Sequence, residues 1–259
     1  MIQIELFGCT SAGKSSLVKA VLQACHDQDI NAVTDDEFVL KQVRLNWTKS
    51  RLVRTLLVDV LALFTCLLSW RRNREFYRLS IRTISHLPAV VGWFERLNLA
   101  RNVLKKVGIY ELVRRLGANQ EGVVVIDEGT IQTAHCLFVH LSADVNLTEV
   151  STFVGLVPLP DLAVYVTQSP SIMVERTLAR GHKRIPVPSY ASVDCFVRRA
   201  VDTFDLVARH VALKGRLLKV EPQQRIVANQ EDQTGLLSAR ILEILRSETD
   251  RATVYAPTI

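Results

Sequence analysis

Short apolar runs alternate with longer amphipathic segments along this chain, and the alternation predicts an α/β protein. Five runs are candidate strands: residues 2–7, 30–33, 123–126, 162–166 and 217–220. The run at 123–126 is continuously apolar, which is typical of a parallel strand covered by helices on both faces. Strands that alternate with helices favour right-handed crossovers within one sheet. We therefore expect a three-layer fold built on a five-stranded parallel sheet.

Helical patterns fill the gaps between these runs. One helix is expected to begin near residue 14, one to lie between Ser169-Pro170 and Gly181, and two more to begin near residues 190 and 235. Serine followed by proline is a helix-start signal, and glycine is a common stop. Residues 41–118 break the alternation, because they contain helical pattern without a convincing strand. We expect a helical insertion there, between the second and third strands.

The most apolar part of this insertion is residues 60–70. It is shorter than the roughly 20 apolar residues that a membrane-spanning helix needs, and Asp59 lies next to it. The simplest interpretation is a core helix, and the alternative is a helix that binds a membrane surface or a partner. For the whole chain we expect one domain over residues 1–248, with a lid at about 176–188 and a loose tail at 249–259.

Charge is concentrated in the insertion. Residues 41–118 hold 16 of the 32 Lys and Arg residues but only 4 of the 26 Asp and Glu residues. This segment therefore has a net charge of +12, and the rest of the chain has a net charge of −6. Such an imbalance indicates an anionic partner, either a membrane surface or a protein. Nucleic acid is disfavoured, because aromatic residues are not interleaved with the basic ones as stacking platforms.

The cysteines and the amino terminus indicate a compartment. Five cysteines with no C-x-x-C pair suggest neither a disulfide framework nor a zinc site. No cationic and apolar leader precedes the first strand. We expect a cytoplasmic protein, with peripheral membrane association through the insertion as the alternative.

The first candidate strand leads directly into a G-x-x-x-x-G-K-[ST] sequence, the Walker A or P-loop motif of nucleotide-binding proteins. Its residues are Gly8, Cys9, Thr10, Ser11, Ala12, Gly13, Lys14 and Ser15, followed by Ser16. The glycines and short side chains let successive backbone N–H groups approach phosphates, and the following helix points its positive end at the same anion. Lys14 is expected to hold the β/γ-phosphates and the Ser15 hydroxyl a magnesium ion. The motif therefore predicts ATP and Mg²⁺ as cofactors in a P-loop NTPase fold.

A carboxylate that supports this site follows the third candidate strand. Asp127 ends the apolar run at 123–126, and the carboxyl end of such a strand lies beside the phosphate loop. We expect Asp127 to hold the magnesium with Ser15. The next residue, Glu128, has two interpretations that the spacing does not separate. It orients a water molecule in a hydrolase, or it contacts the substrate or caps the next helix in a transferase.

Arginines after the fourth strand suggest phosphoryl transfer. Arg176 and Arg180 share one helix face, and Arg184 follows beyond Gly181, which could act as a hinge. Arginine's permanently charged fork suits the charge that spreads over a moving phosphoryl group. A mobile lid carrying these residues would also exclude water. The alternative is a basic helix end that complements its own dipole.

Taken together, these motifs resemble the nucleoside and nucleotide kinases of the P-loop fold, with a core similar to that of thymidylate kinase. The resemblance covers about residues 1–40 and 120–248 and leaves the insertion unexplained. It implies lid roles for Arg176, Arg180 and Arg184, and a base-binding role for the loop after the fifth strand. It also implies that the acidic cluster 35–37, which we expect in a loop, brings Asp35 near the acceptor hydroxyl.

Two positions depart from this family. Glu128 stands where those kinases carry arginine, and Ser11 where they commonly carry glycine. The reversed charge at Glu128 leaves open whether the acceptor is phosphorylated, is an uncharged hydroxyl compound or is bound by the basic insertion. The sequence thus predicts ATP- and magnesium-dependent transfer to a small-molecule hydroxyl or phosphate acceptor. The rival hypothesis is a P-loop ATPase coupled to a membrane or protein partner through the insertion.

Overall fold

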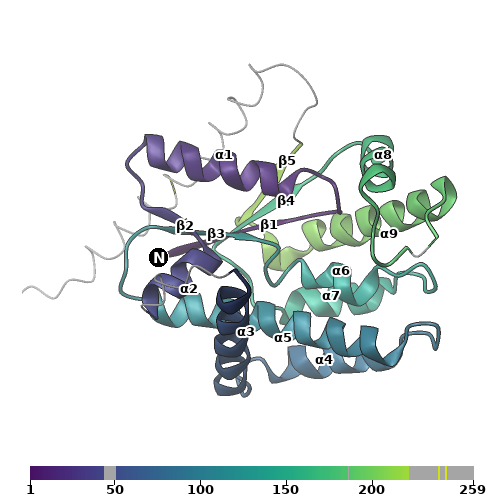
Figure 1. Ribbon diagram of the computed structural model, residues 1–259, viewed down its shortest axis with the longest axis horizontal. Coiled ribbons are helices and arrows are strands. Elements are labelled where there is room, and N and C mark those ends of the chain that lie inside the picture. Colours follow the sequence, from purple (N-terminus) through teal and green to yellow (C-terminus); the bar gives the residue numbers. More distant parts are fainter. Residues whose placement is uncertain (44–50, 186, 222–238, 240–242, 244–259) are drawn as a thin grey trace, which may run out of the picture.

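The computed structural model describes residues 1–43, 51–185 and 187–221 and the single positions 239 and 243. Its strands are β1 (Ile2–Phe7), β2 (Ala32–Thr34), β3 (Val123–Asp127), β4 (Leu162–Val166) and β5 (Leu217–Val220). They form one parallel sheet in the order β2-β3-β1-β4-β5 (Figure 1). The predicted three-layer P-loop NTPase fold with a five-stranded parallel sheet is confirmed. The predicted helix near 235, the loop beyond β5 and the tail lie outside the described residues.

Helices cover both faces of the sheet. They are α1 (Lys14–Asp27), α2 (Asp35–Gln42), α3 (Arg51–Leu68), α4 (Arg74–Ser85), α5 (Trp93–Leu116), α6 (Thr133–Phe138), α7 (Leu147–Leu156), α8 (Pro170–Arg180) and α9 (Tyr190–Arg209), with a 3₁₀ turn at Val211–Leu213. Ile4 and Leu6 of β1 pack with α1 and α8, whereas Phe7 packs with α5, α6 and α7 on the opposite face (Figure 1). Alternate residues of β1 therefore serve two separate cores.

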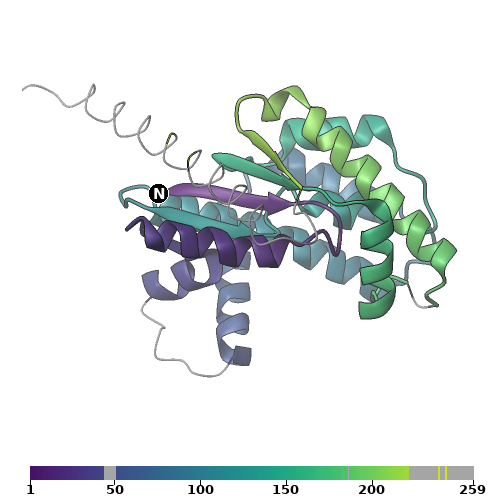
Figure 2. The same ribbon diagram turned by 90° about the horizontal axis from the view of Figure 1, so that it is seen from above.

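The predicted insertion at residues 41–118 contains α3, α4 and α5, which follow α2 and precede β3. Figure 2 shows α2 and α3 standing out from the layers of the sheet. The interpretation of residues 60–70 as a core helix is wrong for half of this segment, because Phe64 and Leu67 are 59% and 70% exposed. The buried side chains Val58 and Ala62 of α3 pack with α2 and α5, and the buried Cys66 contacts Tyr77 of α4. None of the described helices is long and apolar enough to cross a membrane.

Candidate functional site

The turn between β1 and α1 has the backbone shape that the motif predicts. Gly8 and Gly13 have φ values of 145° and 103°, and Ser11 also lies in the left-handed region with a φ of 65°. Glycine is required at position 8, since a Cβ atom there would lie 2.3 Å from the carbonyl oxygen of Val166 in β4. Ser11 therefore adopts a backbone conformation that glycine adopts more easily, because glycine has no side chain. The loop is thus closed against the neighbouring strand.

Lys14 lies over this loop and is almost fully buried. Its Nζ donates hydrogen bonds to the carbonyl oxygens of Gly8 and Cys9, at 3.1 and 3.0 Å. The same Nζ is 3.7 Å from a carboxylate oxygen of Glu128. The ammonium group is therefore held at the centre of the loop, where a phosphate can replace the carboxylate as its partner.

Ser15 and Asp127 meet beside the loop, as the order of β1 and β3 in the sheet requires. The Ser15 hydroxyl donates to Asp127 Oδ2 at 2.6 Å. The other carboxylate oxygen, Oδ1, is buried and has no hydrogen-bond partner among the described residues. Hard oxygen atoms suit Mg²⁺, and an orphaned buried carboxylate oxygen is a free ligand position. The described residues contain no group of three His, Cys, Asp or Glu side chains that could hold a metal ion.

Glu128 is held between two lysines, one of which the sequence did not reveal. Lys106 of α5 donates to the carbonyl oxygen of Glu128 and approaches its carboxylate at 3.8 Å. Although burial raises the pKa of Glu128, Lys106 and Lys14 together hold it below its ordinary value. Glu128 has a φ of 69°, so its backbone turns sharply after β3. The insertion therefore contributes a charged side chain directly to the site.

Gln132 supports the loop from the other side and was also not predicted. Its side-chain oxygen accepts from the Gly8 N–H at 2.9 Å, and its side-chain nitrogen donates to the Gly8 carbonyl at 3.0 Å. Its own N–H donates to the buried carboxylate of Glu5 at 2.9 Å. Burial raises the pKa of Glu5 to about 7, despite this bond and a second one from Thr130. A glutamate within an apolar strand was the one available signal for this network.

A cavity of about 500 Å³ opens beside Asp127 and Glu128. Its walls come from α1, the start of α2, α5 and the end of β3. The lining includes apolar and polar side chains: Val18, Leu22, Ile109, Tyr110, Ile126, Asn102, Lys105 and Lys106. A largely apolar hollow with a few polar groups is the usual form of a small-molecule site.

The acidic cluster 35–37 reaches this cavity from a different element than expected. It is the first turn of α2, not a loop, because Thr34 and Glu37 form a capping box. Asp35 lines the cavity and is half-buried. Burial, followed by the charge of Asp36, raises the pKa of Asp35 to about 7, although Lys106 acts in the opposite direction.

The three predicted lid arginines occupy different places. Arg176 lies at the phosphate loop, where it donates to the Ser11 carbonyl at 3.1 Å. Arg180 is exposed at the end of α8, within electrostatic reach of Glu128. Arg184 instead donates to the carbonyl oxygens of His135 and Val139, at 2.9 and 3.1 Å. In this conformation the structure brings Arg176, but not Arg184, to the loop.

Comparison with known proteins shows similarity to solved structures in the arrangement of helices and strands only. No family model and no curated protein sequence matches the chain. A deoxyadenosine kinase from M. mycoides with the products dCMP and dCDP bound is 10% identical, with a TM-score of 0.46 over 93% of this chain and 100% of its own. TT1252 from Thermus thermophilus is 16% identical, with a TM-score of 0.39 over 93% of this chain and 97% of its own. Because these scores are low, the fold assignment rests on the strand order and the phosphate loop of this chain.

Proposed function

We propose that this protein is a kinase that uses ATP and Mg²⁺ to phosphorylate a small-molecule acceptor. The observation that carries the proposal is the contact between Ser15 and Asp127, next to a closed phosphate loop and at the mouth of a cavity. When bound between these two side chains, Mg²⁺ would supply charge neutralisation at the β/γ-phosphates. The cavity is proposed to hold the acceptor, because Ser15 and Asp127 both line it.

The chain's own residues have separate tasks in this proposal. The loop amides and Lys14 bind the phosphates, and Lys14 exchanges its bond to Glu128 for one to a phosphate oxygen. Arg176, already at Ser11, stabilises charge on the moving phosphoryl group. Arg180, which is exposed at the end of α8, is proposed to join it. Arg184 can contact the phosphoryl group only if it breaks its hydrogen bonds to the carbonyl oxygens of His135 and Val139.

On the acceptor side, Asp35 is proposed to accept the proton of the attacking hydroxyl. With a pKa of about 7, its carboxylate holds a proton in the product and releases it near neutral pH. Lys106 offsets the charge of Glu128, which reduces the repulsion that this glutamate would exert on a phosphorylated acceptor. Both a hydroxyl compound and a phosphate ester therefore stay within the proposal.

The test is a screen of nucleosides, nucleotides and sugars for ADP formation that depends on the acceptor. We expect Lys14→Ala to lower kcat/KM by at least about 100-fold, because it removes a charge that acts on the transferred group. Lys214→Ala, at an exposed lysine beyond α9, is the matched control and should leave the rate unchanged. Full activity of a folded Lys14→Ala protein would refute the proposal.

The same assay separates the proposal from the rival ATPase hypothesis. A hydrolase would release phosphate at the same rate with and without an acceptor. Glu128 would then orient water, and Glu128→Gln would abolish turnover. Under the kinase proposal, ADP formation is fast only when an acceptor is present. The rate of ATP hydrolysis by water stays low, because the acceptor fills the cavity.

A further inference from the structure

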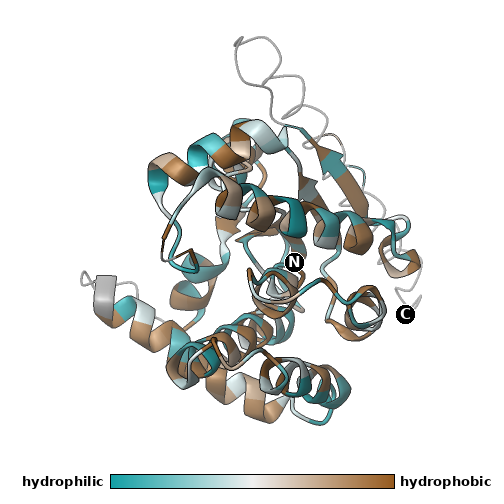
Figure 3. Cartoon of the chain, turned by 90° about the vertical axis from the view of Figure 1, so that its right-hand side faces the viewer, coloured by the Kyte–Doolittle hydropathy of each residue, from teal (hydrophilic) through white to brown (hydrophobic). Residues whose placement is uncertain are grey.

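An exposed apolar stripe runs along the outer side of α3, and no described residue covers it. It consists of Val53, Leu56, Val60, Phe64 and Leu67, which are 44%, 64%, 56%, 59% and 70% exposed. Their spacing of three or four residues places them on one helix face. Leu68 and Trp70, 57% and 40% exposed, continue the apolar surface beyond it. Figure 3 shows hydrophobic residues along this helix, at the edge of the molecule.

The opposite face of α3 is fixed to α5, so the stripe cannot turn inward. At the crossing point Gly108 lies so close to α3 that a Cβ atom would be 1.9 Å from the Ala62 carbonyl oxygen. Asp59, the one acidic residue of the helix, is buried and forms ion pairs with Arg101 and Lys105. The outer face therefore keeps no negative charge, and its orientation is set by contacts on the inner face.

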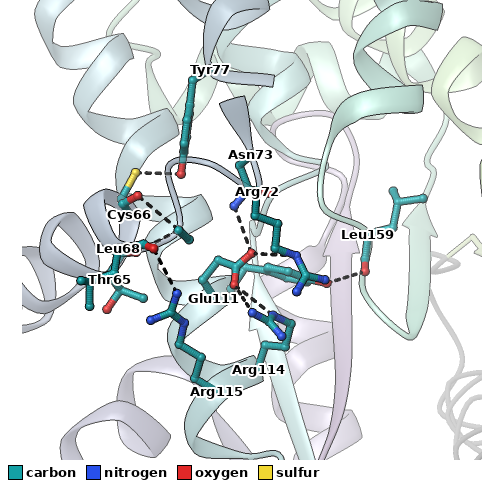
Figure 4. Close-up of polar contacts among 12 residues, drawn as sticks. Thr65, Cys66, Leu68, Arg72, Asn73, Tyr77, Glu111, Arg114, Arg115 and Leu159 are labelled. Carbon is teal, nitrogen blue, oxygen red and sulfur yellow. Dashed lines mark hydrogen bonds and ion pairs between the residues drawn. The ribbon is translucent and has the colours of Figure 1, made fainter. Parts of the chain in front are cut away.

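A polar cluster fixes the carboxyl end of α3 (Figure 4). Arg115 donates to the Leu68 carbonyl at 3.3 Å, and the Ser69 hydroxyl donates to the Thr65 carbonyl at 2.9 Å. The carboxylate of Glu111 is fully buried, and it accepts from Asn73 at 3.0 Å. The turn after α3 is thus tied to α5. The stripe is presented by a rigid support rather than by a free helix.

The exposed charged residues around the stripe are mainly positive, although the exposed Glu75 forms ion pairs with Arg74 and Arg78. Arg54 is exposed near one end, and Arg71, Arg72 and Arg74 are exposed beyond the other. An isologous contact with a second copy would bring these arginines together, which is unfavourable. Phe, Leu and Trp next to arginine are typical of helices that lie in the interface of an anionic membrane. The charge therefore favours a negatively charged lipid surface as the occupant.

We propose that the outer stripe of α3 docks onto an anionic lipid bilayer. The helix lies in the plane of the headgroups, with Phe64 and Leu67 at the boundary of the acyl chains. Arg54 and Arg71 pair with lipid phosphates at the two ends of the stripe. This surface is separate from the phosphate loop, and the inference stands whether or not the proposed kinase activity is correct.

The test is co-sedimentation of the full chain with vesicles of phosphatidylcholine, with and without phosphatidylglycerol. We expect binding to the anionic vesicles alone, and weaker binding as salt is added. Phe64→Gln with Leu67→Gln should weaken binding by about tenfold or more, because two apolar groups no longer leave water. The matched control is Leu147→Gln with Val211→Gln, at positions that are 60% and 76% exposed elsewhere. This control should bind like the wild type.

A second variant tests the electrostatic part without altering the apolar stripe. Arg54→Gln with Arg71→Gln should weaken binding by about 25-fold, at about fivefold for each arginine. The proposal is overturned if the wild type binds neutral and anionic vesicles equally, or binds neither. It is also overturned if the wild type sediments as a dimer that Phe64→Gln with Leu67→Gln dissociates, since a second copy would then cover the stripe.

Discussion

Replacing Gly108 by alanine should destabilise the protein, although alanine is the better helix former. Alanine in a helix interior gains about 1 kcal/mol over glycine. At Gly108 the new methyl group would lie 1.9 Å from the oxygen and 2.5 Å from the carbon of the Ala62 carbonyl. Both atoms are backbone, so α3 must move away from α5 by about 1 Å or more. Overpacking of this kind costs about 3 kcal/mol, which leaves a net loss of about 2 kcal/mol.

Gly155 offers the opposite case in the same fold. It lies in α7, and a Cβ atom there meets nothing within 4 Å. Gly155→Ala should therefore gain about 0.5–1 kcal/mol of unfolding free energy. In thermal denaturation followed by circular dichroism, we expect Gly108→Ala to lower Tm by about 4–8 °C and Gly155→Ala to raise it by about 1–4 °C. Equal shifts in the two variants would refute the argument that α3 and α5 cross in contact at Gly108.

Three further predictions follow from buried or half-buried titrating groups. The pKa of Glu5 is about 7 in the folded protein and has its ordinary value of 4.5 in the unfolded chain. As pH rises, the unfolded chain therefore loses the Glu5 proton at a lower pH than the folded protein does. Stability in urea should therefore fall as pH rises from about 4.5 to 7, and a Glu5→Gln variant that keeps this slope would contradict the assignment. The acceptor-dependent kcat/KM should rise through about pH 7 as Asp35 ionises, and Asp35→Asn should remove the rise; an unchanged pH profile in that variant argues against Asp35 as the base. Burial raises the pKa of the Cys9 thiol to about 12, so a thiol reagent should label Cys136 and Cys195 first, as peptide mass spectrometry can measure; early labelling of Cys9 would show an open loop.

Apolar periodicity was enough to predict most of the sheet. The runs at 162–166 and 217–220 coincide with β4 and β5. The second strand begins later than predicted, because Asp29 has a φ of 56° and the Ile30 N–H bonds to the carbonyl of Cys25 at the end of α1. Ile30 thus belongs to a turn that stops the helix. An apolar residue next to such a turn cannot be told from the first residue of a strand by pattern alone.

The site was predictable where its chemistry is local in sequence. The loop motif and the carboxylate after β3 indicated Ser15 and Asp127, and parallel strand order brings the two together. Gln132 and Lys106 were not predictable, because their contacts depend on tertiary packing. Gln132 bonds to Gly8 across 124 positions of sequence, and Lys106 reaches the site from an insertion of unknown orientation. The expectation of a loop at residues 35–37 was wrong, although the T-x-x-E pattern of Thr34 and Glu37 is the sequence signal of the capping box that begins α2.

Helix α5 is shared by the two surfaces of this protein. Lys105 lines the cavity and also forms an ion pair with Asp59 of α3 at 2.7 Å. One turn away, Gly108 sets the spacing between the same two helices, and Ile109 faces the cavity. The contacts that fix α3 therefore lie within a single helical turn of residues that line the cavity. Excising residues 41–118 would remove that wall of the cavity and leave Glu128 without its second lysine.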